Sequence, residues 1–371
     1  MKDHKKHPAI SKPSTGEYHA VEWAIYGTTC SKVESFVEKV KDQLPEYQFL
    51  FVDADHNKKT EGIEIQYQEK VFHAPYSTVN EYDQKLYSES ADMVFVNGNH
   101  FPASRQIVII DENKEASLEK RIPFLTNLEM VIIKEDEIEI FDFLKPHIQP
   151  TTKIVREDNF DLILHHFIEI NNHFNTPLKA LILAGGKSSR MGVDKSNLVY
   201  HENSPHQLYL STICQELGLE TFISKSELFN GDMIDGIPVL KDRFVGLGPF
   251  GAILTAMMHD RNSAWLVIAC DLPFLDRNFL KELISNRNMS KYATAVKGYD
   301  KPFPEPLITI YEPRAYTRLL QFLSLGKACP RKMLINSDVE IMELEENTII
   351  SNANTMEERQ EILKMLGDHE E

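Results

Sequence analysis

The sequence predicts an α/β protein made of two doubly wound, three-layer domains. Short apolar runs typical of buried strands alternate with amphipathic helical segments, first from Glu22 to about residue 150 and again from Leu178 onward. The chain of 371 residues also exceeds the length that one hydrophobic core commonly serves. We therefore expect two domains, each built on a mainly parallel sheet.

In the first half, the predicted strands are EWAIYG, YQFLFVDAD, ADMVFVNG, RQIVIID and LEMVIIK, with the helical segment SFVEKVKDQL after the first of them. Farther along, apolar residues recur at helical spacing from Phe160 to Phe167, before the polar stretch NNHFNTP. The expected organisation is a flexible tail at 1–19, a first domain at 20–150, a connecting helix and linker at 151–177, and a second domain at 178–371.

The second domain repeats the alternation through LKALILA, ETFISK, IPVLKD, SAWLVIACD, ATAVKG and EPLITIY. Its last predicted element is the helix MEERQEILKML, for which Asn354 or Thr355 would serve as the N-cap.

Composition limits the classes of partner. With 42% hydrophobic and 26% charged residues, the chain is typical of a soluble globular protein. A formal charge of −16 argues against broad binding to nucleic acid or to an anionic membrane, and no apolar run approaches the roughly 20 residues of a membrane span. An anionic ligand would need a local cationic pocket.

The four cysteines, Cys30, Cys214, Cys270 and Cys329, show no CxxC spacing. This scatter disfavours a disulfide framework and a thiolate zinc site, and it favours a reducing cytoplasm as the location.

The stretch LILAGGKSSRMGVDK, Leu181 to Lys195, predicts a phosphate-binding loop. A buried strand ends at Gly185 and Gly186, and glycines there allow main-chain N–H groups to converge on oxyanions. Three cations, Lys187, Arg190 and Lys195, accompany the loop. The alternative is a tight strand-to-helix turn with a solvated cationic face, but that turn does not explain why Arg190, Asp194 and Lys195 gather beside Gly192.

Asp271 is the candidate metal ligand, for Mg²⁺. It follows the apolar strand WLVIAC, and ligands of open α/β sheets collect at the carboxyl ends of strands. Mg²⁺ prefers few carboxylates together with phosphate oxygens and waters. Alternatively, Asp271 caps the following turn, which Pro273 would set.

Several motifs in order resemble one family. LAGGKSSRMGVDK resembles the LAGGxSxRMGxDK signature of molybdenum cofactor guanylyltransferases (MobA), and the likeness continues through VLKDRFVGLGPFGAILTAM, VIACDLPFL, PEPLITIY and SNANTMEE, from Leu178 to Leu366. The resemblance implies a Rossmann-like nucleotidyltransferase fold of the GT-A-like type. It also implies a reaction in which the phosphate of molybdopterin, or Mo-molybdopterin, attacks the α-phosphorus of GTP and displaces pyrophosphate.

The resemblance assigns roles to residues. Asp242 is expected to contact the nucleoside, and backbone N–H groups from Ala184 to Lys187 to cradle phosphates. The full set comprises catalytic residues Arg190, Lys195 and Asp271; nucleotide-binding residues Leu183, Ala184, Gly185, Gly186, Lys187, Lys195, Asp242 and Asp271; the metal ligand Asp271; and, on the molybdopterin side, Asn352 and Asn354.

Some positions depart from the pattern or have a simpler explanation. Ser224 and Lys225 stand where the family often has an Asn, so GTP and CTP remain alternatives. In GLGPFG, the glycines Gly246, Gly248 and Gly251 either let the loop close over the base or only form a turn before a helix. Asp194 with Lys195 is alternatively a surface ion pair, and Asn354 alternatively only a cap.

In the first domain, AIYG followed by TTCSKVESFVEKV resembles the P-loop and helix of the molybdopterin-guanine adaptor family (MobB), and VFVNG resembles that family's VEG strand. The loop is degenerate. Gly27 remains, whereas Lys32, Val33 and Glu34 occupy the places of the second glycine, the lysine and the hydroxyl residue. We expect a degenerate P-loop-like fold without nucleotide hydrolysis; the alternative is an unrelated strand-helix turn.

Three functions follow. The first is a guanylyltransferase whose degenerate adaptor domain docks cofactor-insertion proteins or recipient molybdoenzymes. The second is a related enzyme that uses CTP or another phosphorylated acceptor, such as a sugar 1-phosphate. The third is a non-catalytic scaffold for cofactor assembly, against which the intact Lys195, Asp242 and Asp271 count.

Overall fold

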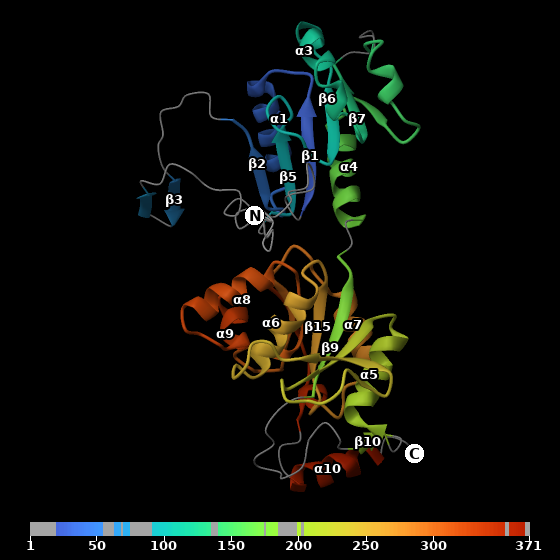
Figure 1. Cartoon of the computed structure of the whole chain (residues 1–371), viewed down its shortest axis with the longest axis vertical. Coiled ribbons are helices and arrows are strands. Elements are labelled where there is room, and N and C mark those ends of the chain that lie inside the picture. Colours follow the sequence, from blue (N-terminus) through green and yellow to red (C-terminus); the bar gives the residue numbers. More distant parts are fainter. Residues whose placement is uncertain are drawn as a thin grey trace, which may run out of the picture. The chain divides into compact units, whose positions relative to one another are not determined.

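The computed structural model describes residues 20–54, 63–67, 70–74, 91–134, 140–173, 176–184, 199–201, 204–352 and 356–367. The predicted tail at 1–19 lies outside them. The chain divides into two compact units, Met1–Asn175 and Thr176–Glu371 (Figure 1). No helix in the described part of the chain is both long and apolar enough to cross a bilayer.

The first unit contains a sheet in which every neighbouring pair of strands runs parallel. Its strands, in spatial order, are β2 (Phe49–Val52), β5 (Met93–Asn97), β1 (Val21–Tyr26), β6 (Arg105–Ile109), β7 (Leu128–Ile133) and β8 (Lys153–Arg156). The described part of this unit also contains α1 (Cys30–Gln43), α3 (Glu115–Glu119), α4 (Phe160–His173), three short 3-10 helices and a separate hairpin of β3 (Ile63–Tyr67) and β4 (Lys70–Ala74).

The central strand β1 is buried on both faces, which is why its sequence VEWAIY is almost wholly apolar. Alternate side chains point to opposite faces: Trp23 joins the core beneath α1 and α4, whereas Ala24 and Tyr26 join a second core that includes Leu118 of α3. Helices and loops therefore cover the sheet on both sides, as expected for parallel strands.

Most of the segment 151–177, expected to be a connecting helix and linker, instead packs within the first unit. Strand β8 pairs with β7, and Phe160, Ile163 and Phe167 of α4 pack into the same core as Trp23. The apolar face of α4 is therefore a core face, and the division between the two units falls after residue 175. The sequence did not indicate that α4 belongs to the first unit, because the polar residues near its end resemble the start of a linker.

The second unit is a three-layer domain around a larger sheet. Its strands, in spatial order, are β13 (Met233–Ile234), β14 (Ile237–Lys241), β12 (Glu220–Lys225), β9 (Leu178–Leu183), β15 (Ala264–Ala269), β17 (Glu305–Tyr311), β16 (Ala293–Lys297) and β18 (Val339–Glu343). The unit also contains the short pair β10 (Val199–His201) and β11 (Ser204–Pro205), a 3-10 helix at Thr348–Ile350 and the helices α5 (His206–Glu216), α6 (Pro249–His259), α7 (Arg277–Ser285), α8 (Ala315–Ser324), α9 (Pro330–Ile335) and α10 (Met356–Gly367).

Helices cover both faces of this sheet. Leu266 and Ile268 of β15 share a core with residues of α5 and α7, whereas Trp265 and Val267 share one with residues of α6, α8 and α9. The predicted α/β class with parallel strands is confirmed for this unit. The sheet is mixed, however, because the short connection 298–304 returns β17 antiparallel to β16.

A buried ion pair joins the residues that directly follow α7 to the residue that follows β17. Arg287 donates from Nε and Nη2 to the two carboxylate oxygens of Glu312, at 2.7 and 2.8 Å, and from Nη1 to the carbonyl of Thr176 at 3.0 Å. Glu312 is wholly buried. Removal of one partner would leave a buried charge without compensation, which costs more than the pair itself contributes.

We predict that Glu312→Gln lowers the free energy of unfolding of the second unit by about 3–5 kcal/mol. Urea unfolding in a Trp23→Phe background measures this, since Trp265 is then the reporter. The matched control is Asp338→Asn, which breaks an exposed ion pair with Lys291 and should cost about 1 kcal/mol or less. Equal losses in the two variants would contradict the prediction.

Candidate active site

Several polar residues of the second unit lie at one edge of its sheet, at the carboxyl ends of neighbouring strands. Strands β14, β12, β9 and β15 are neighbours and run parallel, so their carboxyl ends share that edge. Asp242 follows β14, Lys225 ends β12, Ala184 follows β9, and Asp271 comes shortly after β15. The edge thus carries two carboxylates, a buried amine and the start of the glycine-rich loop.

Lys225 holds the end of β9 against β12. Its buried Nζ donates to the carbonyl oxygen of Ala184 at 2.9 Å, and the N–H of Ala184 donates to the carbonyl of Ser224 at 3.3 Å. The amide of Ala184 is therefore part of the sheet ladder. The expected phosphate cradle from Ala184 to Lys187 otherwise lies outside the described residues.

Asp242 is a half-buried carboxyl group between β14 and β12. Its N–H donates to the carbonyl of Lys225 at 3.0 Å, and the hydroxyl of Ser224 donates to Oδ1 at 3.4 Å. Burial raises the pKa of Asp242 to about 6; the hydrogen bond from Ser224 opposes the rise, and the charge of Glu227 adds to it. A partner that donates hydrogen bonds to the carboxylate would favour its ionised form.

Two histidines hold the loop that begins at Asp271. His201 of β10 donates from Nε2 to the carbonyl of Pro273 at 2.7 Å, and His206 of α5 donates from Nε2 to the carbonyl of Leu272 at 3.0 Å. The ring of Tyr209 stacks on His201 with centroids 4.1 Å apart. The loop is thereby fixed by residues from two other elements.

His206 is buried and stays neutral down to acid pH. Burial lowers its pKa to about 4; the hydrogen bond to Leu272 opposes this effect, and the proximity of His201 adds to it. A neutral ring with its proton on Nε2 is the form that can donate to the carbonyl.

The glycines of GLGPFG serve two different purposes. Gly246 and Gly248 have φ of +82° and +57° and open space where a Cβ would stand, so they form the turn before α6. Gly251 lies inside α6, where a Cβ would collide with the carbonyl oxygen of Phe244. At Gly251 the requirement is close packing of helix and loop.

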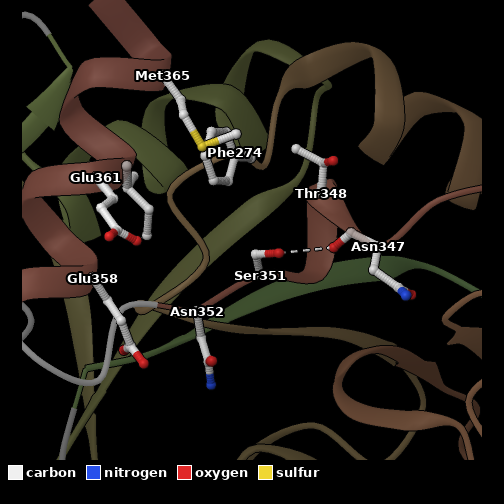
Figure 2. Close-up of a pocket in the computed structure, with 9 residues that line it drawn as sticks. Phe274, Asn347, Thr348, Ser351, Asn352, Glu358, Glu361 and Met365 are labelled. Carbon is white, nitrogen blue, oxygen red and sulfur yellow. Dashed lines mark hydrogen bonds between the residues drawn. The ribbon is translucent and has the colours of Figure 1, made fainter.

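A pocket of about 390 Å³ opens at the same edge of the sheet (Figure 2). Because β17 is antiparallel to both β15 and β16, and β18 is parallel to β16, the carboxyl ends of β16 and β18 lie on the edge where β15 ends. The turn after β18 lines the pocket with Asn347, Thr348, Ser351 and Asn352, the Asp271 loop with Phe274, and α10 with Glu358, Glu361, Ile362 and Met365.

Hydrogen bonds fix the turn after β18. Ser351 donates from Oγ to the carbonyl of Asn347 at 3.0 Å (Figure 2). Asn347 donates from Nδ2 to the carbonyl of Tyr299 at 3.2 Å. The side-chain oxygen of Asn347 is buried and accepts no hydrogen bond from the described residues. The pocket therefore combines the fixed amide group of Asn347 with the side chain of Asn352, carboxylates and an aromatic ring.

The structure thus places some of the predicted site residues. Asp242, Asp271, Leu183 and Ala184 lie at one sheet edge, and Asn352 lines the pocket. The others lie outside the described residues: Gly185, Gly186, Lys187, Arg190, Gly192, Asp194, Lys195 and Asn354. Sequence reasoning missed the roles of His201 and His206, since neither belongs to a spaced motif, and it noted Lys225 only as a departure from a family pattern.

Comparison with known proteins defines the class. Residues 180–341 match the MobA-like NTP transferase domain. The second unit is therefore a nucleotidyltransferase domain.

The chain belongs to the molybdenum cofactor guanylyltransferase family. A probable molybdenum cofactor guanylyltransferase from Carboxydothermus hydrogenoformans is 32% identical over 200 residues, covering 51% of this chain and 97% of that protein. The molybdenum cofactor biosynthesis bifunctional protein of Synechocystis sp. is 33% identical over 184 residues, 49% of this chain; the match spans only 53% of that relative's length. Among solved structures, molybdopterin-guanine dinucleotide biosynthesis protein A from Archaeoglobus fulgidus is 18% identical with a TM-score of 0.42, covering 51% of this chain and 99% of that one.

We predict that acid destabilises the second unit partly through His206. Its pKa is lower in the folded state, about 4, than the 6.5 of a free histidine, so the unfolded chain binds the extra proton between these values. Stability is therefore lost as the pH falls from 6.5 to 4, by about 3 kcal/mol from this group.

The control is His206→Gln, which keeps an N–H donor for the carbonyl of Leu272 but does not titrate. Urea unfolding at a series of pH values should show wild type falling relative to the variant by that amount. Asp242, whose raised pKa acts in the opposite sense, contributes equally to both proteins. Parallel pH profiles would show that His206 does not drive the acid loss.

Proposed function

We propose that the chain transfers GMP from GTP to the phosphate of molybdopterin or Mo-molybdopterin and releases pyrophosphate. The observation that carries this proposal is the complete LAGGxSxRMGxDK loop at the end of β9, flanked on the same sheet edge by Asp242 and Asp271. The names of the curated relatives support the choice of substrates. The proposal describes a reaction that needs charge neutralisation and alignment more than covalent catalysis.

The residues at this edge have different proposed roles in binding phosphate and metal. Backbone N–H groups of Gly185, Gly186 and Lys187 bind phosphate oxygens, and Arg190 and Lys195 stabilise the charge that spreads onto the α-phosphate and the leaving pyrophosphate. The carboxylate of Asp271, half-buried at a strand end, suits Mg²⁺, which needs few protein ligands when phosphates and waters supply the others. When bound, Mg²⁺ would neutralise phosphate charge.

Asp242 is the proposed contact to the base. A carboxylate accepts hydrogen bonds from the two adjacent N–H groups on the guanine edge, whereas cytosine presents a single amino donor beside an acceptor. Lys225 does not replace the family's Asn in this role, because its amine is bound to the carbonyl of Ala184. Ser224 contributes by donating to Asp242. This arrangement favours GTP over CTP.

The pocket that contains Asn352 is the proposed acceptor side. Amide groups of Asn347 and Asn352 and carboxylates of Glu358 and Glu361 match the mixed donors and acceptors of a pterin ring, and Phe274 offers it an apolar surface. Phe274 follows Asp271 by only three residues. One loop therefore carries both the proposed metal ligand and a residue that lines the proposed acceptor pocket.

The first unit is proposed to be a degenerate adaptor domain that docks cofactor-insertion proteins or recipient molybdoenzymes. Gly27, with φ of +86°, turns the chain between β1 and α1, but Lys32 pairs with the buried Asp111 at 2.6 Å. A lysine held in this way cannot compensate for the missing P-loop lysine. Nucleotide hydrolysis is therefore not part of the proposal for this unit.

Pyrophosphate release separates the candidate functions. The proposed enzyme releases pyrophosphate with GTP and molybdopterin together and with neither alone. Release with CTP, or with a sugar 1-phosphate as acceptor, would favour a related nucleotidyltransferase, and no release under any combination would favour a scaffold.

We predict that Asp271→Asn keeps the fold but reduces Mg²⁺-dependent pyrophosphate release by about 10²–10³-fold, since the change removes charge and preserves volume. Asp338→Asn, in an exposed ion pair, is the matched control and should retain activity. Turnover near the wild-type level in Asp271→Asn would remove this residue from the proposed site.

We predict that GTP binding weakens as the pH falls below about 6. The raised pKa of Asp242 means that the free protein must lose a proton before its carboxylate accepts donors from the base. At pH 5 the loss should reach about tenfold, measured by calorimetry. Asp242→Asn is the control, because it shows only the change caused by protonation of the GTP phosphates. If GTP affinity depended on pH in the same way in both proteins, protonation of Asp242 would not be the cause of the weaker binding.

A further inference from the structure

Three neighbouring strands of the first unit each bring one metal-ligating side chain to the same edge. Cys30 begins α1, after β1; Asp53 directly follows β2; and His100 follows β5. Since β2, β5 and β1 are adjacent and parallel, their carboxyl ends lie together. The thiol sulfur, an imidazole nitrogen and a carboxylate oxygen all lie within 4.8 Å of one another.

The contacts converge on a single atom. Sγ of Cys30 lies 3.4 Å from Nε2 of His100, and Oδ1 of Asp53 lies 3.9 Å from the same nitrogen. In a Cys–His–Asp relay the carboxylate would contact the other ring nitrogen, Nδ1. Approach of both groups to Nε2 is instead the arrangement of ligands around a shared centre.

The two separations to Nε2 of His100 are close to those expected around a tetrahedral zinc ion. With Zn–S near 2.3 Å and Zn–N near 2.0 Å, sulfur and nitrogen ligands stand about 3.5 Å apart, and nitrogen and oxygen ligands about 3.4 Å apart. The pair of Cys30 and His100 already has this spacing, and Asp53 would need to approach by about half an ångström.

Surrounding residues hold the three groups in place. The wholly buried Asn97 donates from Nδ2 to Oδ1 of Asp53 at 2.8 Å, and the N–H of His100 donates to the carbonyl of Asn97 at 3.0 Å. The side chain of Thr29 caps α1 by accepting from the N–H of Lys32, which fixes the first turn of the helix and with it Cys30. Such outer contacts orient ligands in metal sites.

We propose that Cys30, Asp53 and His100 form a binding site for a divalent ion of the zinc class. Thiolate and imidazole ligands select zinc over magnesium or calcium, which prefer oxygen. Three protein ligands leave a fourth position for water or an exogenous ligand. The absence of CxxC spacing does not exclude this site, because the fold gathers its ligands from three separate loops.

The test uses the full chain, purified without an affinity tag. Equilibrium dialysis against zinc, with metal measured by mass spectrometry, should give one equivalent per chain in the wild type. Loading with cobalt(II) should give a sulfur-to-cobalt charge-transfer band, which reports the thiolate directly. The histidines His4 and His7 can also bind metal. The site is therefore identified by the difference in zinc binding between the wild type and each variant.

Cys30→Ser, Asp53→Asn and His100→Ala should each weaken zinc binding by more than tenfold, since loss of even an outer contact commonly costs 10–100-fold. The charge-transfer band should vanish in Cys30→Ser. The control is Cys329→Ser, a half-buried cysteine of the second unit. Circular dichroism confirms that each variant is folded. Zinc affinity unchanged in Cys30→Ser and His100→Ala, or no zinc retained by the wild type, would overturn the proposal.

Discussion

Parallel pairing of neighbouring strands forces their carboxyl ends onto one edge of a sheet, and both units depend on this constraint. In the second unit it brings together Asp242, Lys225 and Asp271 from three different strand ends. In the first unit it gathers Cys30, Asp53 and His100 in the same manner. The residues come from distant parts of the chain, and no local interaction would assemble either group.

Buried polar contacts turn this common edge into a fixed site. Lys225 joins two strand ends through the carbonyl of Ala184, and His201 and His206 hold the carbonyls that follow Asp271. Each of these contacts satisfies main-chain groups that burial would otherwise leave costly. The described part of this edge is therefore held by contacts within the fold itself.

Local patterns predicted the α/β class, the strand ends and the order of motifs, because buried strands and glycine turns leave strong sequence signals. They did not predict that β8 and α4, within 151–177, belong to the first unit, since an amphipathic helix does not reveal which core it covers. They also gave no signal for His201 or His206, whose roles depend on carbonyl groups more than 60 residues away along the chain. Lys225 is similar: a lysine is expected at the surface, and only the fold shows that its amine is buried.

The short loop from Asp271 to Phe274 has a geometric consequence. One of its ends carries the proposed metal carboxylate and the other lines the proposed acceptor pocket, with histidine-bound carbonyls between them. Because the carbonyls between them are held, the proposed metal carboxylate and the proposed acceptor pocket would keep a nearly constant separation. Two substrates bound on either side of this loop would therefore meet without a rearrangement of the loop itself.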